Sequence, residues 1–328
     1  MPEALINPSG ALPPSTGNTR IWLDEKARPH NYTELDWVRA LSLLHPVAEL
    51  ANPKGDEVMV DVGTGTGAVL NHLAPYVRQA IGVDVSDAML SRVELADPRV
   101  SVVRGDVTDR LPFPDNCADL VTARMMLHDL EDPIAAVGEL WRLVRPGGRL
   151  IAVEFVTDIC SPEAVEQTDA FENDERDTSL LSGELFTEPS AELAAFHRYL
   201  FELKQEPNRF LWTAQDFKSL FLSVNGTVAS ADIHHSVALR NSVANWLGKS
   251  GFGLEVKQQG LQAYLLAPPE LQDEMGAITT LNEKPLNGGQ QAEWANYYAH
   301  ATPETREKFG IDVKIHRAFA NIVLQKAG

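Results

Sequence analysis

The sequence predicts an α/β fold: a doubly wound, Rossmann-like sheet with helices on both faces. Between residues 57 and 154, short apolar segments such as EVMVDV and AIGVDV alternate with segments of helical periodicity. Strands of a parallel sheet are buried on both faces and are therefore apolar along most of their length. The alternation is typical of a parallel sheet whose strands are connected by helices.

Four segments are expected along the chain. Residues 1–30 are rich in proline, glycine and serine and predict a flexible tail, and residues 31–157 predict the Rossmann-like core. Residues 158–316 are expected to form a helical lid, inserted after the fifth strand and before the last one, together with some core strands. Residues 317–328 contain the apolar segment AFANIVLQK, which is expected to close the sheet.

Local patterns add detail to this organisation. Apolar side chains recur three or four positions apart in several segments, as they do in amphipathic helices. Helices are expected over residues 33–50, 193–203 and 213–222, a strand over 227–237, and a helical block over 241–294 that prolines and glycines interrupt. Pro46 is expected to kink or break the first of these helices.

The composition argues against several classes of function. Asp and Glu outnumber Lys and Arg by 46 to 28 in 328 residues, and no basic cluster could follow a phosphate backbone or an anionic bilayer. We therefore expect no nucleic-acid or membrane partner. The two cysteines, Cys117 and Cys160, are too few for a disulfide framework, and the N-terminus lacks the pattern of a signal peptide. A cytoplasmic protein is expected.

The strongest functional signal is VDVGTGTGAVL at residues 60–70, where a strand leads into glycines and then a helix. Gly63, Gly65 and Gly67 permit a tight turn and the close approach of a nucleotide-type ligand. A dinucleotide site would have the spacing G-x-G-x-x-G, whereas the spacing here is G-x-G-x-G. Asp61 would repel a pyrophosphate and attract a ligand that carries an ammonium group.

Two further carboxylates follow the next strands. Asp84 ends the segment IGVD, where a carboxylate can accept hydrogen bonds from both ribose hydroxyls. Its alternative role is helix capping, although Ser86 can serve as that cap. Asp106 follows the third strand and could accept a hydrogen bond from the exocyclic amine of a purine. A polar residue that merely ends a strand explains Asp106 equally well.

Together these motifs resemble the class I S-adenosylmethionine-dependent methyltransferases. The segments VDVGTGTG, IGVDVS, RGDVTDRLPFPDNCADLVTARMMLHDL and RLVRPGGRLIAVEFV follow one another in that family's order and spacing over about residues 30–157. Within the class, the sequence is most similar to small-molecule methyltransferases related to ubiquinone and menaquinone biosynthesis. Beyond residue 157 the resemblance is limited to WTAQDF, APPEL and the closing strand.

The resemblance implies S-adenosylmethionine as the cofactor and S-adenosylhomocysteine as its product. It places the methionine moiety at the glycine turn, the ribose at Asp84 and the adenine near Asp106. The implied cofactor-binding residues are Tyr32, Asp61, Gly63, Thr64, Gly65, Gly67, Asp84, Val85, Met89, Asp106, Val107, Ala123 and Arg124. Tyr32 is explained equally well as an aromatic residue that covers the core.

Histidines are the candidate bases for a phenol, enol or carbon-acid substrate. His128 follows the fourth strand, at the sheet edge where ligands bind, although a hydrogen-bonded loop histidine explains it equally well. His197 lies in an aromatic-rich helix that could cover an aromatic substrate, although a core or interface helix is the commoner explanation. His234 and His235 are neighbours on a strand and point to opposite faces, so no metal site is expected.

The expected function is transfer of a methyl group to an oxygen or carbon atom of a small, largely apolar or aromatic metabolite of the quinone, phenol or natural-product type. A homodimer is left open. Three alternatives remain: an enzyme that uses the same cofactor site for a cyclisation or isomerisation, an N-methyltransferase, and a binding protein with a disused site. The glycine spacing disfavours a nicotinamide dehydrogenase.

Overall fold

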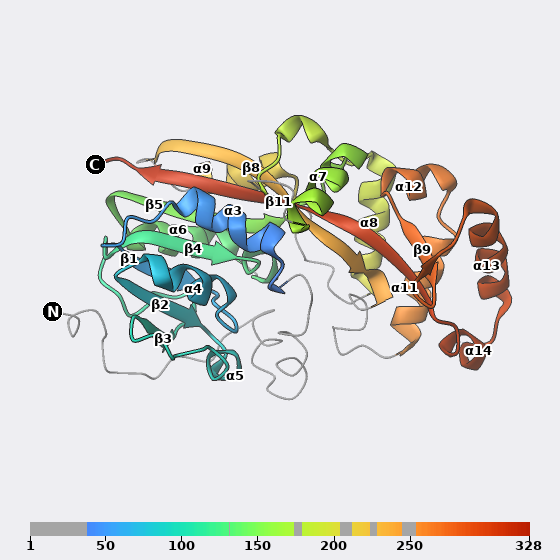
Figure 1. Cartoon of the computed structure of the whole chain (residues 1–328), viewed down its shortest axis with the longest axis horizontal. Coiled ribbons are helices and arrows are strands. Elements are labelled where there is room, and N and C mark those ends of the chain that lie inside the picture. The colour runs from blue at the N-terminus through green and yellow to red at the C-terminus, as the bar shows by residue number, and fades with distance from the viewer. Residues whose placement is uncertain (1–37, 131, 174–178, 204–211, 224–227, 245–253) are drawn as a thin grey trace.

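The computed structural model has two lobes, which are joined by two long strands (Figure 1). It describes residues 38–130, 132–173, 179–203, 212–223, 228–244 and 254–328. The joining strands are β8 (Val228–Ser242) and β11 (Ile311–Lys326), which pair with each other in antiparallel orientation. The sheet-centred lobe comes mainly from the first half of the chain.

The first lobe is built on a mostly parallel sheet, which confirms the predicted α/β class. Its strands besides β8 and β11 are β1 (Val58–Val62), β2 (Gln79–Asp84), β3 (Val100–Arg104), β4 (Ala118–Arg124) and β5 (Val144–Phe155). Their order in space is β3-β2-β1-β4-β5-β11-β8, with β1 to β5 parallel and β11 antiparallel to β5. The strand order reverses between β1 and β4, which is where ligands bind in open sheets of this kind.

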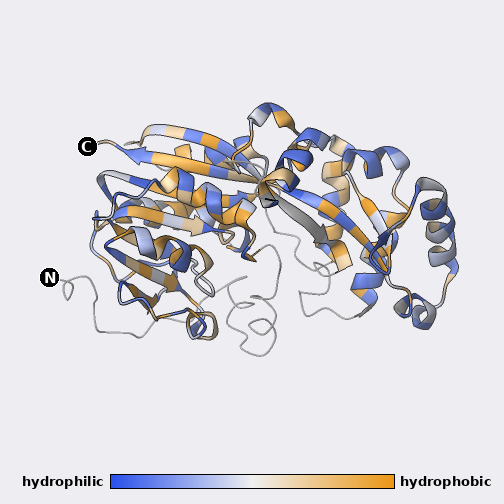
Figure 2. Ribbon diagram, in the orientation of Figure 1, coloured by the Kyte–Doolittle hydropathy of each residue, from blue (hydrophilic) through white to orange (hydrophobic). Residues whose placement is uncertain are grey.

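Helices cover both faces of this sheet. They are α3 (Leu41–Ala51) and α4 (Ala68–Leu73) on one face, and α6 (Pro133–Leu143) and α9 (Ala214–Ser223) on the other. The side chains of β1 alternate between the two cores: Val58 and Val60 pack with α6 and α9, and Met59 packs with α3 and α4. Burial on both faces explains why these strands are apolar along most of their length, as Figure 2 shows.

The first helix differs in extent from its prediction. Residues 33–37 lie outside the described residues, and α3 begins at Leu41. Pro46 lies inside α3 and the helix continues beyond it to Ala51, so the expected break is absent there. Pro46 is itself buried.

The second lobe mixes helices with short strands. Its helices are α8 (Ala191–Leu203), α11 (Leu254–Leu265), α12 (Pro269–Glu274), α13 (Gly288–His300) and α14 (Pro303–Glu307). Helix α7 (Pro162–Glu172) lies at the junction of the lobes and packs on α3 and β8. The strands of the second lobe are β9 (Ile278–Leu281) and β10 (Lys284–Pro285), whereas the short pair β6 (Ile159–Cys160) and β7 (Phe186–Thr187) packs on the core of the first lobe. A separate apolar cluster joins α8, α11 and α13 to the first residues of β11.

The prediction of a helical block over 241–294 is wrong at residues 278–285, where β9 and β10 form a hairpin. Asn282 and Glu283 connect the two strands with φ values of 49° and 68°, the left-handed conformation that two-residue hairpin turns require. The β-branched residues Ile278, Thr279 and Thr280 were the overlooked signal. This hairpin pairs with the first part of β11, so the last strand begins at Ile311 rather than near Ala318.

None of the helices in the described ranges has both the length and the apolar character that a membrane span requires.

Replacement of Ile322 by Ala should lower the free energy of unfolding by about 2–4 kcal/mol. Ile322 lies in β11 and is fully buried in the core on the α6 and α9 side, so truncation leaves a cavity. Urea denaturation measures the change. The matched control is Ile134→Ala, because the side chain of Ile134 is 54% exposed. Equal losses in the two variants would contradict this placement of β11.

Candidate functional site

The chain leaves β1 through a turn that only glycines occupy comfortably. Gly63, Gly65 and Gly67 have φ values of 69°, 55° and 84°, which side chains of L-residues rarely adopt. A Cβ added to Gly63 would lie 2.9 Å from the Cβ and Sδ atoms of Met126. The turn is therefore packed closely against the loop that follows β4.

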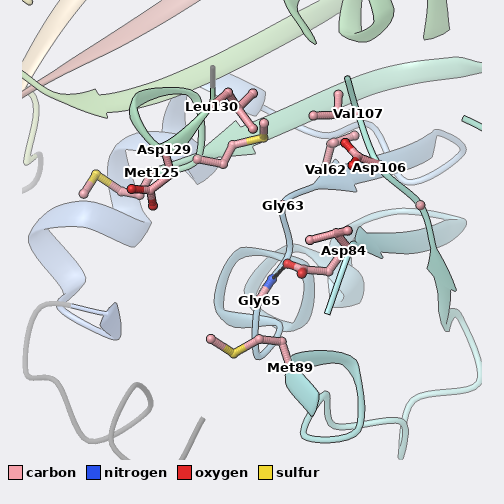
Figure 3. A pocket seen from close by; sticks show the side chains of 13 residues that line it. Val62, Gly63, Gly65, Asp84, Met89, Asp106, Val107, Met125, Asp129 and Leu130 are labelled. Atoms are coloured by element: carbon pink, nitrogen blue, oxygen red, sulfur yellow. Dashed lines mark hydrogen bonds between the residues drawn. The ribbon is translucent and has the colours of Figure 1, made fainter. Parts of the chain in front are cut away.

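A cavity lies at the carboxyl ends of β1 to β4, beside this turn (Figure 3). The loop after β4 forms one side of it, and the ends of β2 and β3 form another. The lining residues are Val62, Gly63, Gly65, Asp84, Val85, Met89, Gly105, Asp106, Val107, Met125, Met126, Asp129 and Leu130. Three carboxylates, those of Asp84, Asp106 and Asp129, thus face the same space as several large apolar side chains.

Asp84 connects the glycine turn to the end of β2. Its Oδ2 accepts a hydrogen bond from the Gly65 N–H at 2.8 Å, and its Oδ1 accepts one from the Ser86 N–H at 2.9 Å. Burial raises the pKa of Asp84, and these backbone hydrogen bonds oppose that shift. Ser86 caps the helix α5 (Asp87–Leu90) by accepting from the Met89 N–H, so helix capping does not account for Asp84.

Asp106 faces the cavity from the segment that follows β3. Its Oδ1 accepts hydrogen bonds from the Thr108 N–H at 3.0 Å and from the Thr108 hydroxyl at 2.7 Å. Within the described part of the chain, no hydrogen bond to Oδ2 is found. A carboxylate oxygen has two lone pairs, so Asp106 can accept further bonds from a ligand.

Asp61 lies beneath the turn, outside the set of lining residues. Its two oxygens accept hydrogen bonds from the hydroxyls of Thr64 and Thr122, each at 2.7 Å. Burial raises the pKa of Asp61 to about 6, although both hydroxyls and the nearby Arg124 stabilise the ionised form. Ionised Asp61 is therefore a buried charge that destabilises the fold.

Of the other residues expected to bind the cofactor, some line the cavity and some lie outside its lining. Val85, Met89 and Val107 line the cavity. Thr64, Gly67, Ala123 and Arg124 lie outside the lining set, in the turn or at the end of β4. The guanidinium of Arg124 donates to the Val38 carbonyl at 2.8 Å. The prediction for Tyr32 falls outside the described residues.

His128 lies behind the cavity wall. Its ring is 5% exposed, and its Nδ1 lies 2.5 Å from Oε2 of Glu154. Its Nε2 lies 3.5 Å from Oδ2 of Asp129, and Asp129 itself lines the cavity. The imidazole does not line the cavity itself but lies beside Asp129, which does. The role of His128 as a base remains a prediction.

The lining residues that follow Arg124 were not predicted from the sequence. Met125, Met126, Asp129 and Leu130 all contribute to the cavity, and Glu154 at the end of β5 holds their loop. Their position directly after a parallel strand at the switch point was a usable signal. Met125 has a φ of 57°, which is uncommon for a residue with a side chain.

His197 is not brought to this cavity. It lies on α8 and is buried beside the apolar cluster of the second lobe, where neither ring nitrogen has a hydrogen-bond partner among the described residues. Burial lowers its pKa to about 3, with a smaller effect from Arg317. His235 stacks on Phe186 with ring centroids 4.4 Å apart.

Comparisons with known proteins relate this part of the chain to methyltransferases. Residues 60–152 match a family described as a methyltransferase domain. The demethylmenaquinone methyltransferase of Beutenbergia cavernae is 35% identical over 106 residues, which are 32% of this chain and 44% of that protein. The ubiquinone/menaquinone biosynthesis C-methyltransferase UbiE of Psychromonas ingrahamii is 35% identical over 118 residues, 33% and 46% of the two chains.

The chain contains a class I S-adenosylmethionine-dependent methyltransferase domain. The cofactor of this domain is S-adenosylmethionine. The YcgJ protein of Bacillus subtilis shares the fold, with a TM-score of 0.57 and 18% identity over 87% of this chain and 98% of that chain. The chain spans less than half the length of the two relatives named above, and the similarity is concentrated in the methyltransferase domain.

Replacement of Asp61 by Asn should stabilise the methyltransferase domain at neutral pH. The folded state raises the pKa of Asp61 from 3.8 to about 6, so ionisation favours the unfolded state as the pH rises through that range. The stability difference between variant and wild type should be small below pH 4 and should grow to about 3 kcal/mol above pH 6. Urea denaturation from pH 4 to pH 8 measures it.

The control for Asp61 is Asp56→Asn, since Asp56 is exposed at the opposite edge of the sheet. A stability difference for Asp61→Asn that does not change with pH would show that the carboxylate is not a buried charge.

Replacement of His197 by Leu should make the protein more resistant to acid. The folded state lowers the pKa of His197 from 6.5 to about 3, so protonation below pH 6.5 favours unfolding and stability is lost as the pH falls toward 3. Acid unfolding followed by circular dichroism should show a lower midpoint for the variant. The control is the exposed His300, and an unchanged midpoint for His197→Leu would contradict the buried, neutral state.

Proposed function

We propose that the chain transfers the methyl group of S-adenosylmethionine to a carbon or oxygen atom of a small, largely apolar or aromatic metabolite of the quinone or phenol type. One observation carries the proposal: Asp84 and Asp106, from adjacent strand ends, line one cavity with the glycine turn. Two carboxylates beside a glycine turn suit the ribose hydroxyls and the amine of an adenine nucleoside.

The lining residues fit the cofactor by their chemistry. Asp84 has one bond to each oxygen and keeps acceptor capacity for ribose hydroxyls. Asp106 and the apolar Val85, Met89 and Val107 suit the adenine amine and ring. The glycine turn suits the methionine moiety, because backbone N–H groups can approach it closely there. Supporting roles are proposed for Tyr32, Asp61, Thr64, Gly67, Ala123 and Arg124.

S-adenosylmethionine supplies an electrophilic methyl group when bound, so the protein needs mainly to align the acceptor and exclude water. A phenol, enol or carbon acid must also give up a proton. Asp129 is the acid-base group of the loop wall that faces the cavity, and His128 contacts it from behind. We infer that proton transfer uses Asp129 and His128 together, and His197 has no part in it.

The class of acceptor follows from the same loop. Met125, Met126 and Leu130 present flexible apolar side chains to the cavity beside Asp129, which suits a flat apolar molecule with one acidic position. Of the two relatives named above, one is called a demethylmenaquinone methyltransferase and the other a ubiquinone/menaquinone biosynthesis C-methyltransferase. Both observations support a carbon or oxygen acceptor rather than an amine.

Replacement of Asp84 by Ala should weaken the affinity for S-adenosylhomocysteine about 30-fold, or about 2 kcal/mol, because hydrogen bonds to a charged acceptor are lost. Isothermal titration with S-adenosylhomocysteine measures it, and NAD should not bind the wild type. Asp97→Ala is the control, since it removes the same charge from a surface ion pair with Arg99. Unchanged affinity in Asp84→Ala would show that the ribose lies elsewhere.

Turnover distinguishes the proposed reaction from its alternatives. The protein, S-adenosylmethionine and a panel of hydroxyquinones, phenols and amines would be incubated, and S-adenosylhomocysteine would be measured. Release of S-adenosylhomocysteine with a phenol or hydroxyquinone is the expected result. A converted acceptor without that release would indicate cyclisation or isomerisation instead, and turnover of amines alone would indicate N-methylation.

A further inference from the structure

Glu154 makes an unusual set of contacts for a residue that does not line the cavity. It lies at the carboxyl end of β5 and is 1% exposed. Its Oε1 accepts hydrogen bonds from the N–H groups of Met126 and Leu127, at 2.8 and 2.7 Å. Its Oε2 lies 2.5 Å from Nδ1 of His128. One buried carboxylate thus holds three consecutive residues of the loop after β4.

This loop needs such a partner because its backbone is strained. Met125 adopts a left-handed φ of 57°, which costs of order 1–3 kcal/mol for a residue with a side chain and persists only where surrounding contacts enforce it. The Met125 N–H donates to the Val153 carbonyl at 2.8 Å, and Glu154 then fixes the next two N–H groups. The end of β5 therefore enforces the conformation of the loop after β4.

The same conformation places three side chains at the cavity. Met125, Met126 and Asp129 all line it, and Met126 fills the space that a Cβ on Gly63 would need. The glycine turn and the loop after β4 therefore pack closely against each other. A displacement of the loop would change both the wall of the cavity and the support of the turn.

We propose that Glu154 is a positioning residue for this cavity: it holds the loop after β4 in its strained conformation and fixes the ring of His128, which lies beside Asp129. Nδ1 of the ring faces Glu154, and Nε2 lies 3.5 Å from Oδ2 of Asp129. Only a ring that carries a proton on both nitrogens can donate to both carboxylates. The ring is also packed edge-on against Phe155 at 4.9 Å. The inference rests on the proposed function, because the cavity is taken as the cofactor site.

Glu57 provides a matched control at the other edge of the sheet. It directly precedes β1 and is 6% exposed. Its carboxylate accepts from the Lys54 N–H at 2.7 Å and from the Arg149 guanidinium at 2.8 Å. Both glutamates are thus buried acceptors of a backbone N–H and a side-chain N–H, but only Glu154 lies beside the cavity.

The experiment compares Ala and Gln at both positions by thermal unfolding and by titration with S-adenosylhomocysteine. Glu154→Ala should weaken the affinity about tenfold, because the loop loses its anchor. Glu154→Gln should stay within about threefold of the wild type, because its Oε1 can still accept from Met126 and Leu127. Both Glu57 variants should unfold at lower temperature and keep wild-type affinity.

Hydrogen exchange at the Met126 and Leu127 amides gives a second readout. It should accelerate in Glu154→Ala and remain slow in Glu154→Gln and in both Glu57 variants. If Glu154→Ala does not fold, Glu154→Asp replaces it. The shorter side chain keeps the charge but withdraws the oxygens from the loop, so the same loss of affinity is expected.

Wild-type affinity in Glu154→Ala, or an equal loss in Glu57→Ala, would overturn the positioning role. Failure of the wild type to bind S-adenosylhomocysteine would instead overturn the proposed function, so the two failures are distinguishable.

Discussion

Buried carboxylates that accept backbone N–H groups at the carboxyl edge of the sheet are the interaction on which the site depends. Asp84 at the end of β2 holds the turn that follows β1, and Glu154 at the end of β5 holds the loop that follows β4. Each carboxylate thus joins one strand end to a loop that leaves another strand. The N–H groups of these two loops lack the backbone partners that a helix or a strand would supply, so they need acceptors of this kind.

This arrangement has an energetic cost that a purely apolar edge would avoid. Burial raises the pKa of both Asp61 and Asp84, so their charged forms are disfavoured in the folded protein. Threonine hydroxyls and backbone N–H groups offset part of that cost without adding a positive side chain inside the cavity. The remaining negative potential beside the glycine turn suits a ligand with an ammonium group and hydroxyl donors. The supporting role proposed for Asp61 therefore comes at a cost in stability.

The second lobe is attached to the site through β11. The last residues of this strand pair with β5 in the central sheet, and its first residues pair with β9. Between these two regions the pairing with β8 shifts register at residues 315–317. The strand therefore extends beyond the carboxyl edge of β5, and the helices α8, α11 and α13 pack on its far end. The second lobe therefore shares one continuous sheet with the end of β5.

The sequence by itself determined the α/β class, the glycine turn and the carboxylates Asp84 and Asp106, because periodicity, glycine spacing and strand ends are local properties of the chain. It could not place the β9–β10 hairpin, whose short strands exist because β11 continues far enough to pair with them. It could not separate His128 from His197 either. Tertiary structure put one imidazole between Glu154 and Asp129 and buried the other on α8. Glu154 had no local signal, since its partners lie 26 to 28 residues away and meet it only because β4 and β5 are adjacent parallel strands.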